Sequence, residues 1–127
     1  MEALSKTERE IIREMIVKEY GAGSLFLDQL AGARVENREF TGRGVFVNLR
    51  LAENIPPIDQ LNSEISRGYK TALPAPADVV GFTLFIRNGR LSFLEGYTFG
   101  DWAEWPGELS EDWLVMRPIV PAKQKAR

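Results

Sequence analysis

The feature that most constrains this chain is the dipeptide Asn88-Gly89, which lies between two segments rich in aliphatic, aromatic and β-branched residues. The tightest hairpin turns need positive φ angles at both central residues, and asparagine and glycine tolerate such angles best. The sequence therefore predicts a β-hairpin whose arms are residues 79–87 and 90–99.

The alternation of residue types assigns the side chains of the two arms to faces, because successive side chains of a strand point to opposite sides of a sheet. The residues that this assigns to one face are Phe82, Leu84 and Ile86 in the first arm, and Leu91, Phe93, Glu95, Tyr97 and Phe99 in the second. The opposite faces still carry Phe85 and Leu94. We therefore expect the hairpin to lie centrally in a sheet and to be partly covered on both sides.

Two helices are predicted before the first strand. Ser5 and Glu8 have the spacing of a capping box, in which a hydroxyl and a carboxylate satisfy free amides at a helix start. The apolar residues that follow recur every three or four positions, and they are Ile12, Met15, Ile16 and Tyr20. The first helix, of about 13 residues, should end at Gly21. A shorter second helix should begin at a Ser24 cap and end at Gly32.

Three further strands are predicted, at residues 33–40, 45–51 and 113–116. Residues 41–44, Thr-Gly-Arg-Gly, should form a tight turn because of their glycines. They lack the lysine and the following helix that a phosphate-binding loop needs. Residues 58–66 fit either a helix or a strand, and we favour a strand over 61–66. Prolines indicate a loop over 68–78.

This order of elements predicts the fold class. Helices that precede a run of strands are typical of an α+β domain. We expect the N-terminal helices to pack on one face of an antiparallel sheet of about five or six strands. A single domain over residues 1–120 should be followed by a flexible basic tail, residues 121–127.

The composition excludes several classes of site. The chain has no cysteine and no histidine, which excludes disulfides, thiolate nucleophiles, histidine-based triads and the commonest transition-metal ligands. The net charge is −2 without a basic stripe, so we expect no nucleic-acid partner. No segment is apolar enough for a signal peptide or a membrane span. We expect a cytoplasmic protein with no cofactor, no metal and no membrane partner.

One segment carries an unusual combination of residues. From Glu95 to Trp113 the chain contains six acidic residues, no basic residue and all three tryptophans. This pattern predicts an acidic aromatic surface that holds a cationic group, a sugar or a protein partner. Its candidate binding residues are Glu95, Tyr97, Asp101, Trp102, Glu104 and Trp105. Alternatively, Trp102 and Trp105 fold back over the hairpin and the acids are simply solvated.

Glu95 is the functional residue that the sequence indicates most specifically. It shares a strand face with Phe93 and Tyr97, where an unpaired carboxylate would be costly. We therefore expect it to pair with a cation or a hydrogen-bond donor, or to lie at the edge of a cleft as a functional carboxylate. The candidate cations are Arg43, Arg50 and Arg87.

Two segments resemble a family of small uncharacterised bacterial proteins. Residues 38–46 contain the family's T-G-x-G-x-F pattern, and residues 81–98 match G-F-x-L-F-x-x-x-G-x-L-S-x-L-E-G-Y-T, followed by Trp105-Pro106. The resemblance covers about residues 25–107, although 58–78 do not match. It implies a compact α+β domain from a bacterium. The family has no assigned reaction, so the resemblance implies no catalytic residue.

These observations lead to three hypotheses about function. We favour a non-enzymatic binding or interaction module that uses the acidic aromatic surface to hold a protein partner or a small ligand. The second hypothesis is a small enzyme with Glu95 as acid or base in a cleft. The third is a homodimeric structural domain that associates through a sheet edge or face.

Overall fold

The computed structural model describes residues 1–73, 78–99, 104–105 and 114–118. These residues form two helices and an antiparallel sheet of seven strands in the order β1-β2-β3-β6-β5-β4-β7. The elements are β1 (Glu2–Ala3), α1 (Lys6–Tyr20), α2 (Phe26–Ala31), β2 (Arg34–Phe40), β3 (Gly44–Arg50), β4 (Ser63–Thr71), β5 (Val79–Arg87), β6 (Arg90–Thr98) and β7 (Leu114–Pro118). The predicted α+β class is confirmed, and the predicted hairpin, β5 and β6, is central in the sheet.

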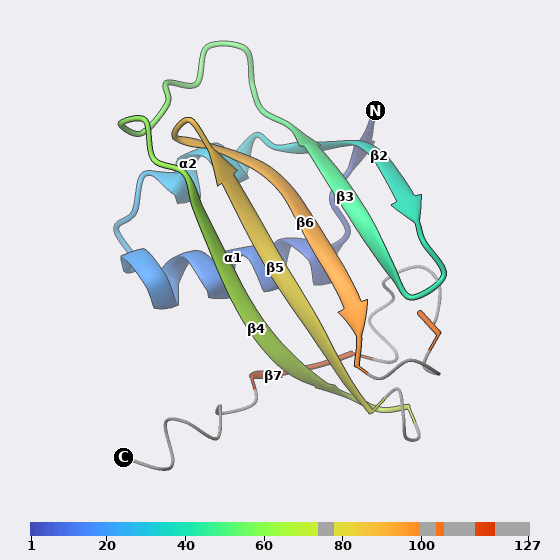
Figure 1. Cartoon of the computed structure of the whole chain (residues 1–127). Coiled ribbons are helices and arrows are strands. Elements are labelled where there is room, and N and C mark those ends of the chain that lie inside the picture. Colours follow the sequence, from blue (N-terminus) through green and yellow to red (C-terminus); the bar gives the residue numbers. More distant parts are fainter. Residues whose placement is uncertain (74–77, 100–103, 106–113, 119–127) are drawn as a thin grey trace.

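Both helices pack on the same side of the sheet, behind the strands in Figure 1. The core lies between them and the sheet, and its fully buried members include Ile12, Met15, Ile16, Val47, Phe82, Leu84 and Leu94. In the described part of the chain no helix covers the opposite side, which we call the uncovered face. The hairpin was expected to be partly covered on both sides, and the two helices cover only one of them.

The start of α1 is held by a buried ion pair as well as by the predicted capping box. The Ser5 hydroxyl accepts a hydrogen bond from the Glu8 amide at 3.0 Å, and the Glu8 carboxylate accepts one from the Ser5 amide at 2.8 Å. Glu8 is only 1% exposed, and the Arg38 guanidinium donates to both of its oxygens at 2.8 and 2.7 Å. Hydrogen bonding to Glu8 raises the pKa of Arg38. The pair fastens α1 to β2.

The turn of the central hairpin has the predicted conformation but lies under other segments. Asn88 has a φ of 52° and Gly89 a φ of 74°, as a turn with two positive φ angles requires. The Gly89 amide donates to the Leu61 carbonyl at 2.7 Å, and its carbonyl accepts from the Ile58 amide at 2.8 Å. A Cβ atom on Gly89 would lie 2.4 Å from the Ile58 carbonyl oxygen. Only glycine therefore fits between the turn and the loop after β3.

Gln29 of α2 joins the helix to the same turn. Its side-chain amide donates to the Gly89 carbonyl at 2.9 Å and to the Pro56 carbonyl at 3.2 Å. Its amide oxygen accepts from the Leu91 amide at 2.9 Å. Gln29 is 1% exposed, so these bonds satisfy a polar group that would otherwise be costly to bury.

A β-bulge follows the turn and decides which residues of β6 face outward. Phe85 pairs with Phe93, but the next residue of β5, Ile86, pairs with Leu91. Ser92 is therefore an extra residue in β6, and such an insertion exchanges the faces of all residues beyond it. The predicted face that joins Leu91 to Phe93 is wrong, because Leu91 is buried on the helix side and Phe93 lies on the uncovered face.

The ambiguous middle segment is a strand, but it is longer than predicted. β4 begins at Ser63 and continues to Thr71, so the first residues of the predicted 68–78 loop belong to the sheet. Gly68, the first residue of the predicted loop, instead pairs with Gly81 inside the β4–β5 ladder. β7 covers the last predicted strand from Leu114 onward. Trp113 and the predicted tail, 121–127, lie outside the described residues.

Tyr69 connects β4 to α1 through a buried hydroxyl. It is fully buried and donates to the Glu14 carboxylate at 2.5 Å. The Arg67 guanidinium lies 3.9 Å from the same carboxylate. Burial, together with the negative charge of Glu14, raises the pKa of the Tyr69 hydroxyl above its ordinary value. The hydroxyl therefore stays protonated in the folded protein at a pH where an unfolded tyrosine ionises.

Replacement of Gln29 by leucine should lower the free energy of unfolding by about 2–3 kcal/mol, because the Leu91 amide and the Pro56 carbonyl lose their side-chain partner and the Gly89 carbonyl keeps only the Ile58 amide. Gln60→Leu is the matched control, since Gln60 is exposed and its side chain makes no hydrogen bond among the described residues. Urea unfolding of both variants measures the difference. Equal stabilities would contradict the role assigned to Gln29.

Tyr69→Phe should lower the free energy of unfolding at pH 7 by about 1–2 kcal/mol, because Glu14 loses its donor. The stabilisation by Tyr69 is fully present below the unfolded-state pKa, near 10, and is lost as the pH rises further. The difference in the free energy of unfolding between wild type and variant should therefore be smaller at pH 11 than at pH 7. Urea unfolding at both pH values, with Tyr20→Phe as control, measures it; a constant gap would refute the linkage.

Candidate functional site

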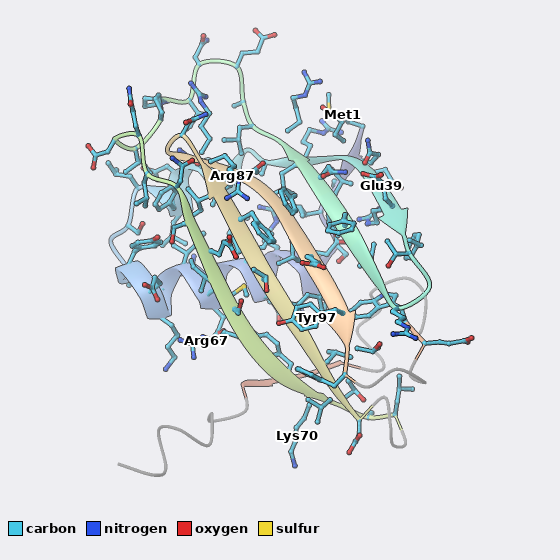
Figure 2. All side chains as sticks on the ribbon, in the orientation of Figure 1. Met1, Glu39, Arg67, Lys70, Arg87 and Tyr97 are labelled. Carbon is cyan, nitrogen blue, oxygen red and sulfur yellow. The ribbon has the colours of Figure 1, made fainter. Side chains whose placement is uncertain are left out.

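Three rows of residues cross the central strands on the uncovered face, as the strand register requires. The rows are Asn48, Phe93, Phe85 and Glu64; then Phe46, Glu95, Thr83 and Ser66; then Gly44, Tyr97, Gly81 and Gly68. Figure 2 looks onto this face and shows Arg87 and Tyr97 toward opposite ends of the hairpin. The face therefore carries phenylalanines near the hairpin turn and mostly glycines in the row that contains Tyr97.

Three phenylalanines meet in the middle of the uncovered face, and we call Phe46, Phe85 and Phe93 the aromatic patch. The rings of Phe85 and Phe93 are stacked with centroids 4.2 Å apart and planes 15° apart. Phe46 meets Phe93 edge to face at 5.9 Å. All three are partly buried. The Arg87 guanidinium lies over the Phe85 ring, 5.1 Å from its centroid, a cation–π contact.

A cavity of about 380 Å³ lies beyond the patch, where the end of β3 passes the hairpin turn. We call it the arginine hollow, and it is lined by Leu49, Arg50, Leu51, Ala52, Glu53, Arg87, Arg90, Leu91 and Ser92. Three arginines and one acidic residue, Glu53, thus line the same space. This part of the surface is positive, although the whole chain has a net charge of −2.

The three arginines of the hollow differ in how their charge is used. Arg50 forms an ion pair with Glu36, with its Nε and Nη2 atoms 2.7 and 2.6 Å from the carboxylate. Arg90 donates to the Ile55 carbonyl at 3.0 Å. Within the described ranges, no carboxylate pairs with Arg87 or Arg90. Two of the three arginines therefore form no ion pair among the described residues.

A second cavity, of about 350 Å³, lies between α2 and the loop after β3. Its lining is mostly apolar and includes Leu25, Ile55, Pro56, Pro57 and Ile58, with the carboxylates of Asp28 and Asp59. Gln29 also lines it, but its side chain already holds the hairpin turn. Among the described residues, no group of three or more acidic side chains could hold a metal ion.

Trp105 was predicted to lie on a solvent-facing surface, but in the structure it is buried. Its side chain is 8% exposed and meets Phe82 edge to face at 5.7 Å on the helix side of the sheet. It lies directly over Gly96, where a Cβ atom would be 2.6 Å from the indole. The alternative, that this indole folds back over the hairpin, is confirmed for Trp105.

The predicted Thr-Gly-Arg-Gly turn explains how Trp105 is held there. The Thr41 amide donates to the Gly44 carbonyl at 2.9 Å and Gly42 has a φ of 90°, which confirms a tight turn. The Gly42 carbonyl accepts from the Trp105 amide at 2.8 Å, and the Arg43 carbonyl accepts from the Thr98 amide at 3.0 Å. The turn thus uses carbonyl groups to fasten the chain beyond β6.

The other predicted site residues do not all lie on the same face of the sheet, and two of them lie outside the described residues. Glu104 is exposed, whereas Asp101 and Trp102 lie outside the described residues. Tyr97 lies on the uncovered face with its ring over Gly81, where a Cβ atom would be 2.3 Å from the ring. Of the four described residues of the predicted acidic aromatic surface, Glu95 and Tyr97 share the uncovered face, whereas Trp105 is buried on the helix side.

Glu95 lies in the middle of the uncovered face, half-buried between Phe46 of β3 and Thr83 of β5. Its carboxylate makes no hydrogen bond or ion pair with any described residue, so the predicted pairing with an arginine is absent there. It lines neither of the two cavities. Thr83, its cross-strand neighbour, is already hydrogen-bonded to Ser66 at 2.8 Å.

The arginine hollow was not predicted from the sequence. The sequence patterns indicate Arg50 and Arg87 only as candidate partners of Glu95, and they indicate no role for Arg90. One signal was available, because Arg87 and Arg90 flank the Asn-Gly turn and must project from the same hairpin end. The contribution of Arg50 depends on the pairing of β3 with β6, which has no local signature.

Comparisons with known protein families, with characterised proteins and with solved structures found no match. The resemblance to a bacterial family, the bacterial origin and the cytoplasmic location therefore stay predictions. No helix in the described ranges has the length and apolar character needed to cross a membrane.

Trp105→Ala should lower the free energy of unfolding by about 3–5 kcal/mol, because it removes a buried ring that packs on Phe82 and Gly96. Glu104, the exposed neighbour, provides the control. Glu104→Ala should change the free energy of unfolding by less than about 0.5 kcal/mol. Urea unfolding measures both. A stable Trp105→Ala variant would restore this indole as a candidate for surface recognition.

Proposed function

We propose that this protein is a non-enzymatic binding module that holds a small anionic ligand, bearing a phosphate or a carboxylate, in the arginine hollow. The observation that carries this proposal is that Arg50, Arg87 and Arg90 all line one cavity of about 380 Å³. Two of these guanidinium groups have no carboxylate partner among the described residues.

The chemistry of the arginine side chain supports an anion as ligand. A guanidinium presents several N–H donors in a planar fork that matches the oxygens of phosphate and carboxylate groups. Like charges that converge on one cavity repel one another, and a bound anion relieves this repulsion. The volume of the hollow is in the range of small-molecule sites. Ser92, in the same lining, adds a hydroxyl donor.

Binding is favoured over catalysis because the lining lacks a general base suited to neutral pH. The chain has no histidine and no cysteine, and Glu95, the predicted acid or base, does not line the hollow. An enzyme with Glu95 as its acid or base therefore has less support than a binding module. A protein partner and a homodimer stay predictions that no observation favours over a small anion.

Isothermal titration with inorganic phosphate, pyrophosphate and citrate should reveal binding that weakens as the salt concentration rises. Arg87→Gln and Arg90→Gln should each weaken this binding at least about tenfold, because each removes a charge-assisted hydrogen bond. Arg13→Gln is the matched control, since Arg13 is exposed on α1, on the opposite side of the sheet. Absence of binding by wild type, or equal weakening by all three substitutions, would refute the proposal.

A further inference from the structure

We infer that the anion is one end of a longer ligand, a purine nucleoside monophosphate, whose base lies across the aromatic patch and donates hydrogen bonds to Glu95. This inference rests on the proposed function, because it places the phosphate in the arginine hollow. It adds the part of the ligand that lies outside the hollow. Three features of the uncovered face lead to it.

The first feature is that the hollow and the aromatic patch form one continuous surface. Arg87 lines the hollow and also covers the ring of Phe85. Ser92 lines the hollow and directly precedes Phe93 in β6. A ligand anchored at the arginines therefore extends directly onto the phenylalanines.

The second feature is the orientation of the phenylalanine rings. Phe85 and Phe93 place their faces against each other, and Arg87 takes up a face of Phe85. The ring edges are then left to meet a ligand from the solvent side. Because ring edges carry partial positive charge, they prefer the negative face of another aromatic system. A planar ring laid across the patch meets this preference, whereas an aliphatic chain gains only apolar contact.

The third feature is the carboxylate of Glu95, which lies next to Phe46 at the end of the patch away from the hollow. It lies in the row beyond Phe93 and Phe85 and has no partner among the described residues. An ionised carboxylate only accepts hydrogen bonds, so the ligand must present donors at this point. Guanine presents two adjacent N–H donors on one edge of its ring, and two such donors match the two oxygens of a carboxylate.

The spacing of the strand backbone fits a ligand of this length. Arg87 and Thr83, the cross-strand neighbour of Glu95, are four residues apart in β5, which corresponds to about 13 Å along a strand. The long arginine side chain covers part of this distance. Phosphate and base at the two ends of a mononucleotide would thus reach Arg87 and Glu95 together, with the sugar between them.

Titration calorimetry with the full chain can separate this inference from the proposed function. The probes are inorganic phosphate, ribose 5-phosphate, GMP and IMP, which lacks the exocyclic amino group of GMP. We expect GMP to bind at least about tenfold more tightly than ribose 5-phosphate and several times more tightly than IMP. Glu95→Gln should reduce the preference for GMP over IMP to about one. Glu19→Gln, an exposed position on α1, should leave it unchanged.

Each result has a definite meaning. Binding of all four probes with equal affinity overturns the inference about the base and leaves the anion site intact. A preference for GMP that survives in Glu95→Gln overturns the role of Glu95. If no probe binds, both proposals fail. Phe93→Leu is a second variant that keeps an apolar side chain, and it should lower the affinity for GMP toward that for ribose 5-phosphate without changing phosphate binding.

Discussion

The structure depends on the contact between Gln29 and the turn of the central hairpin. One buried side chain donates to the carbonyls of Gly89 and Pro56 and accepts from the amide of Leu91. These three bonds join α2, the loop after β3 and the start of β6. Because a buried amide without partners is costly, this arrangement has few alternatives. These bonds hold the hairpin end, and the two arginines that flank its turn, Arg87 and Arg90, line the same cavity.

The bulge next to this contact decides what each face of the sheet does. The extra residue, Ser92, places Leu94 and Gly96 toward the helices, and Phe93 and Glu95 toward solvent. The missing side chain of Gly96 makes room for Trp105, which completes the core. A strictly alternating strand would exchange these roles. The same local irregularity therefore produces both the packed face and the candidate binding face.

Two groups of charges in this small protein contrast in their use. Glu8 and Arg38 are largely buried, form several hydrogen bonds and hold α1 against β2. A buried charge must be paired in this way to be tolerated. Arg87, Arg90 and Glu95 are more exposed and form no ion pair among the described residues. Water can solvate such groups, so they cost the fold little and remain free to bind a ligand.

Local patterns in the sequence determined the helix start at Ser5, the Asn-Gly hairpin, the turn at residues 41–44 and the α+β class, because each depends on residues close together in the chain. Only the tertiary structure decided the face of Phe93, the burial of Trp105 and the arginine hollow. Gln29 forms hydrogen bonds with Gly89 and Leu91, which lie 60 and 62 positions further along the chain. Arg50 joins the hollow through the pairing of β3 with β6. Such contacts leave no periodic signal, because they depend on register and packing between distant segments.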